Sequence, residues 1–112
     1  EIVEGVAALN KCTVKIDFED GYPVTFNHAD ETEFATKVAQ EIVGVDKVMT
    51  DVPPVMGAED FSYMLEARPG AFICIGNGPT AGLHHPEYDF NDKAIPYGVS
   101  YWVRLAETAL AA

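Results

Sequence analysis

The chain has 112 residues, 48% of them hydrophobic and 11% aromatic, a composition that excludes a disordered segment and allows one hydrophobic core. Its 18 acidic residues outnumber its 7 basic ones, which gives a formal net charge of −11. This charge disfavours nucleic acids and anionic membranes as partners; it either favours cations or serves solubility alone.

The first element is predicted to be a helix, followed by a strand. The chain has no initial Met and opens in helical register, with Ile2, Val6 and Leu9 on one side, so we expect the sequence to begin inside an element of a longer protein. Residues 13–19 then alternate strictly between apolar and polar side chains. This alternation is typical of a half-exposed strand in an antiparallel sheet.

A turn signal at Asp20-Gly21 separates these residues from the rest of the chain. We place a domain boundary there, with residues 1–20 ending one domain and residues 21–112 forming part of another. Residues 22–27 are predicted to be an extended segment that leads away from the boundary. The two parts are expected to contribute to different sheets.

Two helices are predicted in the middle of the chain. Asp30 followed by Glu33 is close to a capping box, and apolar residues then recur at helical spacing until Gly44. After a break at two consecutive prolines, a second helix is predicted through residues 61–65, ending near Gly70.

The last third of the chain is predicted to have α/β character. Residues 71–75 form a continuous apolar run, which is typical of a strand buried on both faces, and a glycine-rich loop follows over residues 76–82. A C-terminal helix is predicted through residues 99–110, with Asn91 or Asp92 as its cap. Ligands of open α/β sheets lie beyond the carboxyl ends of the strands, and the histidine-rich loop lies at that position.

This loop, over residues 82–92, contains two of the three histidines and several carboxylates. Its candidate metal ligands are His84, His85, Glu87, Asp89 and Asp92. A catalytic zinc-type site needs about three protein ligands and an open position. Side chains of adjacent residues in an extended loop diverge, so at most one of the two histidines is expected to bind an ion. The spacing matches no closed zinc motif, and spacing alone favours a structural role for the loop.

Other candidates for chemistry have simpler explanations. Glu59 and Asp60 could be a catalytic acidic pair, but acids in a first helical turn are expected to complement the helix dipole. A Cys74 nucleophile with His84 as base is disfavoured, because a thiol packed in an apolar run carries little thiolate. His28 is interpreted as a solvated linker residue. The two cysteines are too few for a disulfide framework, so we expect a reducing, cytoplasmic compartment.

Three ordered motifs resemble the C-terminal region of the metal-dependent amidohydrolases of the aminoacylase and carboxypeptidase family. They are Met-Gly-Ala-Glu-Asp-Phe-Ser-Tyr at 56–63, Pro-Gly-Ala-Phe at 69–72 and Leu-His-His-Pro-Glu-Tyr-Asp-Phe-Asn-Asp at 83–92. The match is strongest to the hippurate hydrolase and auxin-conjugate hydrolase subfamily. Residues 21–25 resemble the family's passage from the lid domain into the catalytic domain, so the resemblance covers essentially the whole chain.

The resemblance implies a zinc-peptidase α/β catalytic domain with an inserted α+β lid domain that mediates dimerisation. Residues 1–20 would end the lid, and residues 21–112 would be the C-terminal part of the catalytic domain. The implied activity is hydrolysis of N-acyl amino acids or similar small amides, with two divalent ions per active site. A lone imidazole is compatible with zinc, manganese, cobalt or nickel. The implied partners are a small substrate, the N-terminal portion of the same enzyme and a second copy in a homodimer.

At single positions the resemblance is narrower. The first histidine of the family's Leu-His-x-Pro pattern is a metal ligand, which corresponds to His84, whereas His85 is not carried over as a ligand. Gly57, Glu59 and Asp60 fall on the family's active-site loop, where they and His85 are expected to shape the surroundings of the metal.

The family's other ligands and its general-base glutamate have no counterpart in this chain, so we expect no catalytic residue here. The isolated chain is therefore expected to be inactive and to self-associate through exposed apolar faces. A non-catalytic binding or assembly module that keeps the metallopeptidase scaffold is the alternative. An independent cation-binding domain built on the acidic loop is a third possibility.

Overall fold

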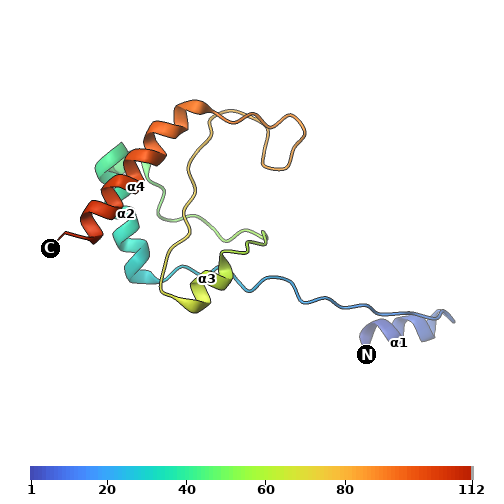
Figure 1. Ribbon diagram of the computed structural model, residues 1–112. Coiled ribbons are helices and arrows are strands. Elements are labelled where there is room, and N and C mark those ends of the chain that lie inside the picture. Colours follow the sequence, from blue (N-terminus) through green and yellow to red (C-terminus); the bar gives the residue numbers. More distant parts are fainter. Residues whose placement is uncertain (112) are drawn as a thin grey trace.

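The computed structural model describes residues 1–111 and consists of helices joined by long extended segments (Figure 1). The elements in chain order are α1 (Ile2–Leu9), α2 (Ala29–Val43), the short 3-10 helix η1 (Val45–Lys47), α3 (Ser62–Ala67), the 3-10 helix η2 (Asp92–Ala94) and α4 (Ile95–Ala109). The radius of gyration is 20.3 Å. A compact domain of this length would have a value of about 13 Å, so the chain is open rather than closed on one core.

Helices α2 and α4 lie side by side and form the main packed unit (Figure 1). Val38 of α2 is 1% exposed, and Tyr101 of α4 is also buried. The two helices are joined by an ion pair in which Arg104 Nε donates to Glu41 Oε2 at 2.7 Å. Glu41 raises the pKa of the Arg104 guanidinium, first through this hydrogen bond and then through its charge. The apolar spacing therefore identifies the contact surface of α2, whereas the expected apolar stripe of α4 is wrong: Val99, Trp102 and Val103 are exposed.

Side chains just before α2 fasten a distant segment, residues 70–72, to the start of this helix. The Asn27 amide donates to the Phe72 carbonyl at 2.8 Å and accepts from the Phe72 N–H at 2.7 Å. His28 is the N-cap residue of α2; its backbone N–H donates to the Gly70 carbonyl at 3.0 Å, and its Nδ1 accepts from the Gly70 N–H at 3.2 Å. The interpretation of His28 as a solvated linker residue is wrong, because the ring is half-buried and holds two segments together.

The predicted helices are confirmed, but two start differently from the expected positions. Asp30 lies inside the first turn of α2, and no side-chain hydrogen bond caps this helix, so the expected capping box is not formed. Helix α3 begins at Ser62, which leaves Glu59 and Asp60 before the helix rather than in its first turn. Glu59 Oε1 instead accepts a local hydrogen bond from the Phe61 N–H at 3.2 Å.

The cap expected for the C-terminal helix, Asn91, caps the preceding 3-10 helix η2 instead. Asn91 Oδ1 accepts from the Lys93 N–H at 3.1 Å and so caps η2, which leads directly into α4. Pro96 lies in the first turn of α4, where its missing N–H has no helical partner to lose. The boundary is therefore a 3-10 turn followed by an α-helix.

The predicted strands are not formed within residues 1–111, and the expected α/β sheet is absent from this part of the chain. Residues 13–19 belong to the long connection after α1, and residues 71–75 run as an extended segment (Figure 1). A strand requires backbone hydrogen bonds to a neighbouring strand. Neither segment has such a partner among the described residues. Cys74, expected to pack in a buried strand, is accordingly exposed.

Many apolar side chains remain exposed. In α1, which Figure 1 shows apart from the other helices, Ile2 is 84% and Leu9 is 85% exposed. Trp102 of α4 is 64% exposed, although it packs edge-on against Tyr101 with ring centroids 5.5 Å apart. Exposed apolar surface of this extent is typical of faces that bind another protein segment or a ligand. Among residues 1–111, no helix combines the length and apolarity that spanning a membrane requires.

Candidate functional site

The two adjacent histidines lie on a closed loop that leaves the extended segment after α3 and returns to η2, drawn in orange in Figure 1. Two turns shape this loop: the His85 N–H donates to the Gly82 carbonyl at 3.1 Å, and the Tyr88 N–H donates to the His85 carbonyl at 2.9 Å. Glycine and proline in the sequence suit these turns. The loop therefore has a defined conformation although it lacks regular secondary structure.

Asn77 closes the base of this loop. Its Nδ2 donates to the Asp89 carbonyl at 2.7 Å, and its Oδ1 accepts from the Asn91 N–H at 2.7 Å. Thr80 adds a third connection, because its hydroxyl accepts from the Asp89 N–H at 3.3 Å. Gly78 has a φ of 82°, and a Cβ atom there would lie 3.3 Å from the side-chain nitrogen Nδ2 of Asn91. Glycine therefore suits both the backbone conformation and the limited space.

His84 stands out in the loop by its backbone and by its free ring. Its φ of 65° lies in the left-handed region, which is uncommon for residues other than glycine. The side chain is exposed, and it forms no hydrogen bond to another residue in the range 1–111. Both ring nitrogens are therefore available to a ligand from outside the chain.

His85 has a different environment. Its Nδ1 accepts a hydrogen bond from the Glu87 N–H at 3.1 Å. In the neutral ring this bond uses the Nδ1 lone pair and puts the proton on Nε2, which leaves no free lone pair for an ion. The two neighbouring histidines thus differ: the Nδ1 of His85 is engaged by the backbone, whereas neither ring nitrogen of His84 has a partner within residues 1–111.

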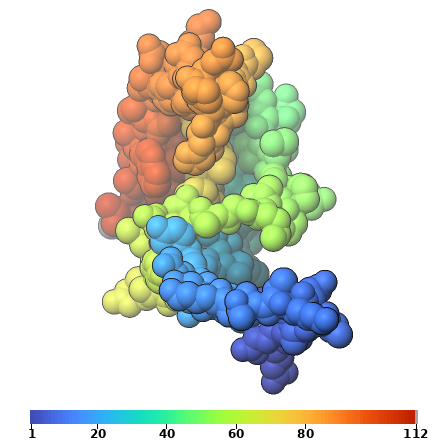
Figure 2. All heavy atoms as spheres, turned by 90° about the vertical axis from the view of Figure 1, so that its right-hand side faces the viewer, coloured from blue at the N-terminus to red at the C-terminus, as the bar shows by residue number. Residues whose placement is uncertain are grey.

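The expected acidic neighbours do not complete a metal site. No group of three His, Cys, Asp or Glu side chains within residues 1–111 could hold an ion. Figure 1 separates the orange loop from the yellow-green segment before α3 that carries Gly57, Glu59 and Asp60. Figure 2 nevertheless shows both segments on the same face of the molecule, with the orange loop above the yellow-green segment. Residues 1–111 can supply one imidazole to a divalent metal. A catalytic site of the zinc type requires about three protein ligands.

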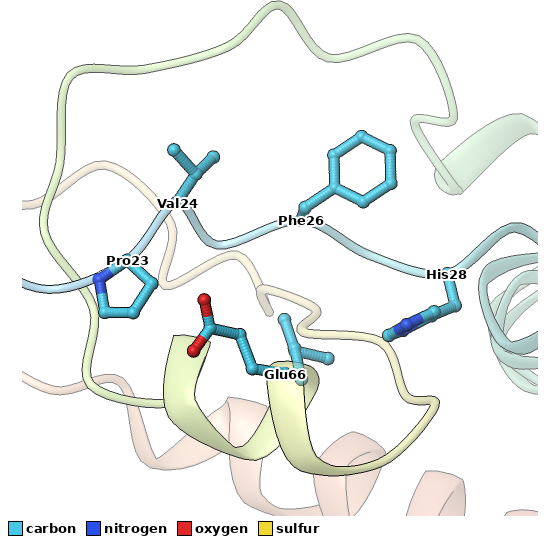
Figure 3. A pocket seen from close by; sticks show the side chains of 6 residues that line it. Pro23, Val24, Phe26, His28 and Glu66 are labelled. Atoms are coloured by element: carbon cyan, nitrogen blue, oxygen red, sulfur yellow. The ribbon is translucent and has the colours of Figure 1, made fainter.

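A groove of about 520 Å³, which no sequence motif predicted, lies elsewhere on the molecule. Its lining residues are Pro23, Val24, Phe26, His28, Leu65 and Glu66 (Figure 3). In Figure 3 the Glu66 carboxylate points toward Pro23 and away from the His28 ring. The acid and the imidazole therefore do not form a pair that could transfer a proton, and the groove offers no catalytic constellation.

Comparison with known proteins finds a family match to "Peptidase family M20/M25/M40" over residues 2–108. The chain is 33% identical over 106 residues to the hippurate hydrolase of Campylobacter jejuni, covering 95% of this chain and 28% of that protein. It is 29% identical over 115 residues to the IAA-amino acid hydrolase ILR1-like 4 of Arabidopsis thaliana (95% and 26%).

A third relative is the N-acetyldiaminopimelate deacetylase of Lacticaseibacillus casei, 32% identical over 110 residues, covering 96% of this chain and 28% of that protein. The chain thus spans about a quarter of the length of the curated relatives it matches. No solved structure matches it. The resemblance to amidohydrolases inferred from the three sequence motifs is confirmed.

Proposed function

The chain belongs to Peptidase family M20/M25/M40, and on this premise we propose that it is the C-terminal part of a metal-dependent hydrolase of N-acyl amino acids or similar small amides. Three relatives support this substrate class by their names: a hippurate hydrolase, an IAA-amino acid hydrolase and an N-acetyldiaminopimelate deacetylase.

One observation carries the assignment of the metal ligand: His84 presents an exposed imidazole without a hydrogen-bond partner in residues 1–111, on a loop whose ends are held together. A bound divalent ion would polarise the amide carbonyl and supply a nucleophilic water molecule at neutral pH. His84 would bind this ion through one ring nitrogen. A lone imidazole suits zinc, manganese, cobalt or nickel.

The rest of the site is proposed to come from the remainder of the same protein, including the general base and the other ligands of two ions. The segment with Gly57, Glu59 and Asp60 shares a face with the His84 loop, which supports a role for these residues and His85 in shaping the surroundings of the metal (Figure 2). Residues 1–20, whose helix α1 lies apart, would end a lid domain that joins two copies in a homodimer.

The test is hydrolysis by the full protein that carries this chain, compared with hydrolysis by residues 1–112 alone. We expect the full protein to cleave hippurate or an N-acetyl amino acid, to lose activity on treatment with a chelator and to recover it with added metal. The 112-residue chain should be inactive. Hydrolysis by the isolated chain, or activity of the full protein that a chelator does not affect, would contradict the proposal.

A further inference from the structure

We propose that Asn77 is a positioning residue whose side-chain amide holds the His84 loop in the conformation that binds metal. This inference rests on the proposed function, because it concerns how His84 is presented. Asn77 does not itself reach the ion. It acts by fixing the two ends of the loop on which His84 lies.

The hydrogen-bond pattern of Asn77 imitates that of a β-strand. Its amide donates to the carbonyl of Asp89 and accepts from the N–H of Asn91, two backbone groups that flank Phe90. The N–H and C=O of one residue in a parallel strand bond in this way to the two residues that flank its neighbour. Asn77 is half-buried, and both distances are 2.7 Å. One side chain thus replaces a strand pairing at the base of the loop.

The backbone conformation of His84 explains why the loop needs the hydrogen bonds of Asn77. A residue with a side chain adopts the left-handed conformation at an energetic cost, and it keeps this conformation only where the surrounding structure enforces it. In this loop the enforcing contacts are the bonds of Asn77, the weaker bond from Asp89 to Thr80, and the two turns. Without Asn77 the loop can open, and His84 can relax to an ordinary conformation that carries the imidazole away.

Asn27 provides a matched control. Its amide also makes two short hydrogen bonds to backbone groups, both on Phe72, and it lies outside the loop. Asn77→Ala and Asn27→Ala therefore remove the same chemistry from different places. If Asn77 only stabilises the fold, the two variants should affect metal binding alike. If Asn77 positions the His84 loop, only Asn77→Ala should change the metal site.

The experiment uses the full protein and cobalt(II) as the probe, with affinity measured by competition against a chelator and coordination followed by visible absorption. We expect Asn77→Ala to weaken cobalt binding roughly 10- to 100-fold, the range found when outer partners of ligands are removed, and to alter the absorption bands. Asn77→Asp, which retains the acceptor for the Asn91 N–H, should fall between wild type and Asn77→Ala. Asn27→Ala should bind cobalt as wild type does.

A second readout needs no metal. In the metal-free protein, backbone amide hydrogen exchange at Asn91 should speed up in Asn77→Ala and stay unchanged in Asn27→Ala, because only the first variant frees that N–H. If Asn77→Ala does not fold, the cobalt affinity of Asn77→Asp decides the matter, and a wild-type value overturns the inference.

His84→Ala separates the inference from the proposed function. If His84→Ala binds cobalt as wild type does, the proposed function fails. If His84→Ala weakens binding but Asn77→Ala does not, only the positioning role of Asn77 fails. Equal weakening by Asn77→Ala and Asn27→Ala would also overturn the inference, because it would show a general effect on the fold.

Discussion

The exposed face of α4 allows a quantitative prediction about the full protein. Trp102 is 64% exposed in the chain described here. A tryptophan side chain buries up to about 250 Å² when fully covered, so roughly 160 Å² of its surface awaits a covering segment. At about 25 cal/mol per Å², covering this surface contributes about 4 kcal/mol, and the part already buried contributes about 2 kcal/mol. The sum of about 6 kcal/mol is an upper bound, since alanine keeps part of this area, so Trp102→Ala should destabilise the full protein by about 3–5 kcal/mol.

The assay is urea unfolding of the full protein, followed by far-UV circular dichroism so that the lost indole does not affect the signal. Glu107→Ala is a matched control, because Glu107 is an exposed charged residue on the same helix and should change stability by less than about 0.5 kcal/mol. A loss of only about 2 kcal/mol for Trp102→Ala would refute the reasoning, since it would show that this face of α4 stays in water.

Three further predictions concern charges on α2 and α4. Burial raises the pKa of Tyr101, so the folded state retains the phenol proton to higher pH than the unfolded state does. The free energy of unfolding should therefore decrease as pH rises above about 10. In urea unfolding, Tyr101→Phe should show a smaller decrease of the midpoint over this pH range. Lys37 lowers the pKa of Glu33, so its contribution should vanish as pH falls below about 4.5, and thermal melts of Lys37→Met should show a weaker acid dependence. Arg104→Ala should shift the urea midpoint only slightly, because its pair with Glu41 is half exposed and solvent screens the charges.

Helices were predictable from the sequence because their signal is local. The 3.6-residue spacing of apolar side chains predicts both α2 and α4, and in α2 it includes the buried Val38. In α4 it fails to identify the packed face, because Val99, Trp102 and Val103 are exposed and Tyr101 is buried instead. Helix starts were less predictable. Asp30 lies inside the first turn of α2, and His28 is the N-cap residue without a side-chain cap, because its Nδ1 accepts from the distant Gly70 N–H.

The strands were not recoverable in the same way. Alternation over residues 13–19 reports that one face of a segment is apolar, but a strand also needs hydrogen-bonding neighbours on at least one side. Residues 1–111 do not provide them, so an apolar pattern that suits a sheet remains an extended segment with exposed side chains. The alternating pattern indicates that the segment can pair in a sheet, but it does not show whether a partner strand lies within residues 1–111.

In the candidate site, His84 was selected from the sequence only through its motif, and its role as a metal ligand stays a prediction. Spacing alone favoured a structural role for His84, and the resemblance to amidohydrolases selected it over His85. The structure adds a physical difference between the two rings, because the Nδ1 of His85 is engaged by the Glu87 N–H. Asn77 was not predictable, because its bonds join a side chain to backbone groups 12 and 14 residues away and leave no periodic trace in the sequence.

The most direct test of the central claim, that His84 binds a catalytic metal within a larger enzyme, is the metal content of two neighbouring variants. The full protein with His84→Ala and with His85→Ala would each be loaded with zinc, dialysed and measured by elemental analysis. We expect less bound zinc in His84→Ala and a wild-type amount in His85→Ala. Equal metal content in wild type and His84→Ala would contradict it.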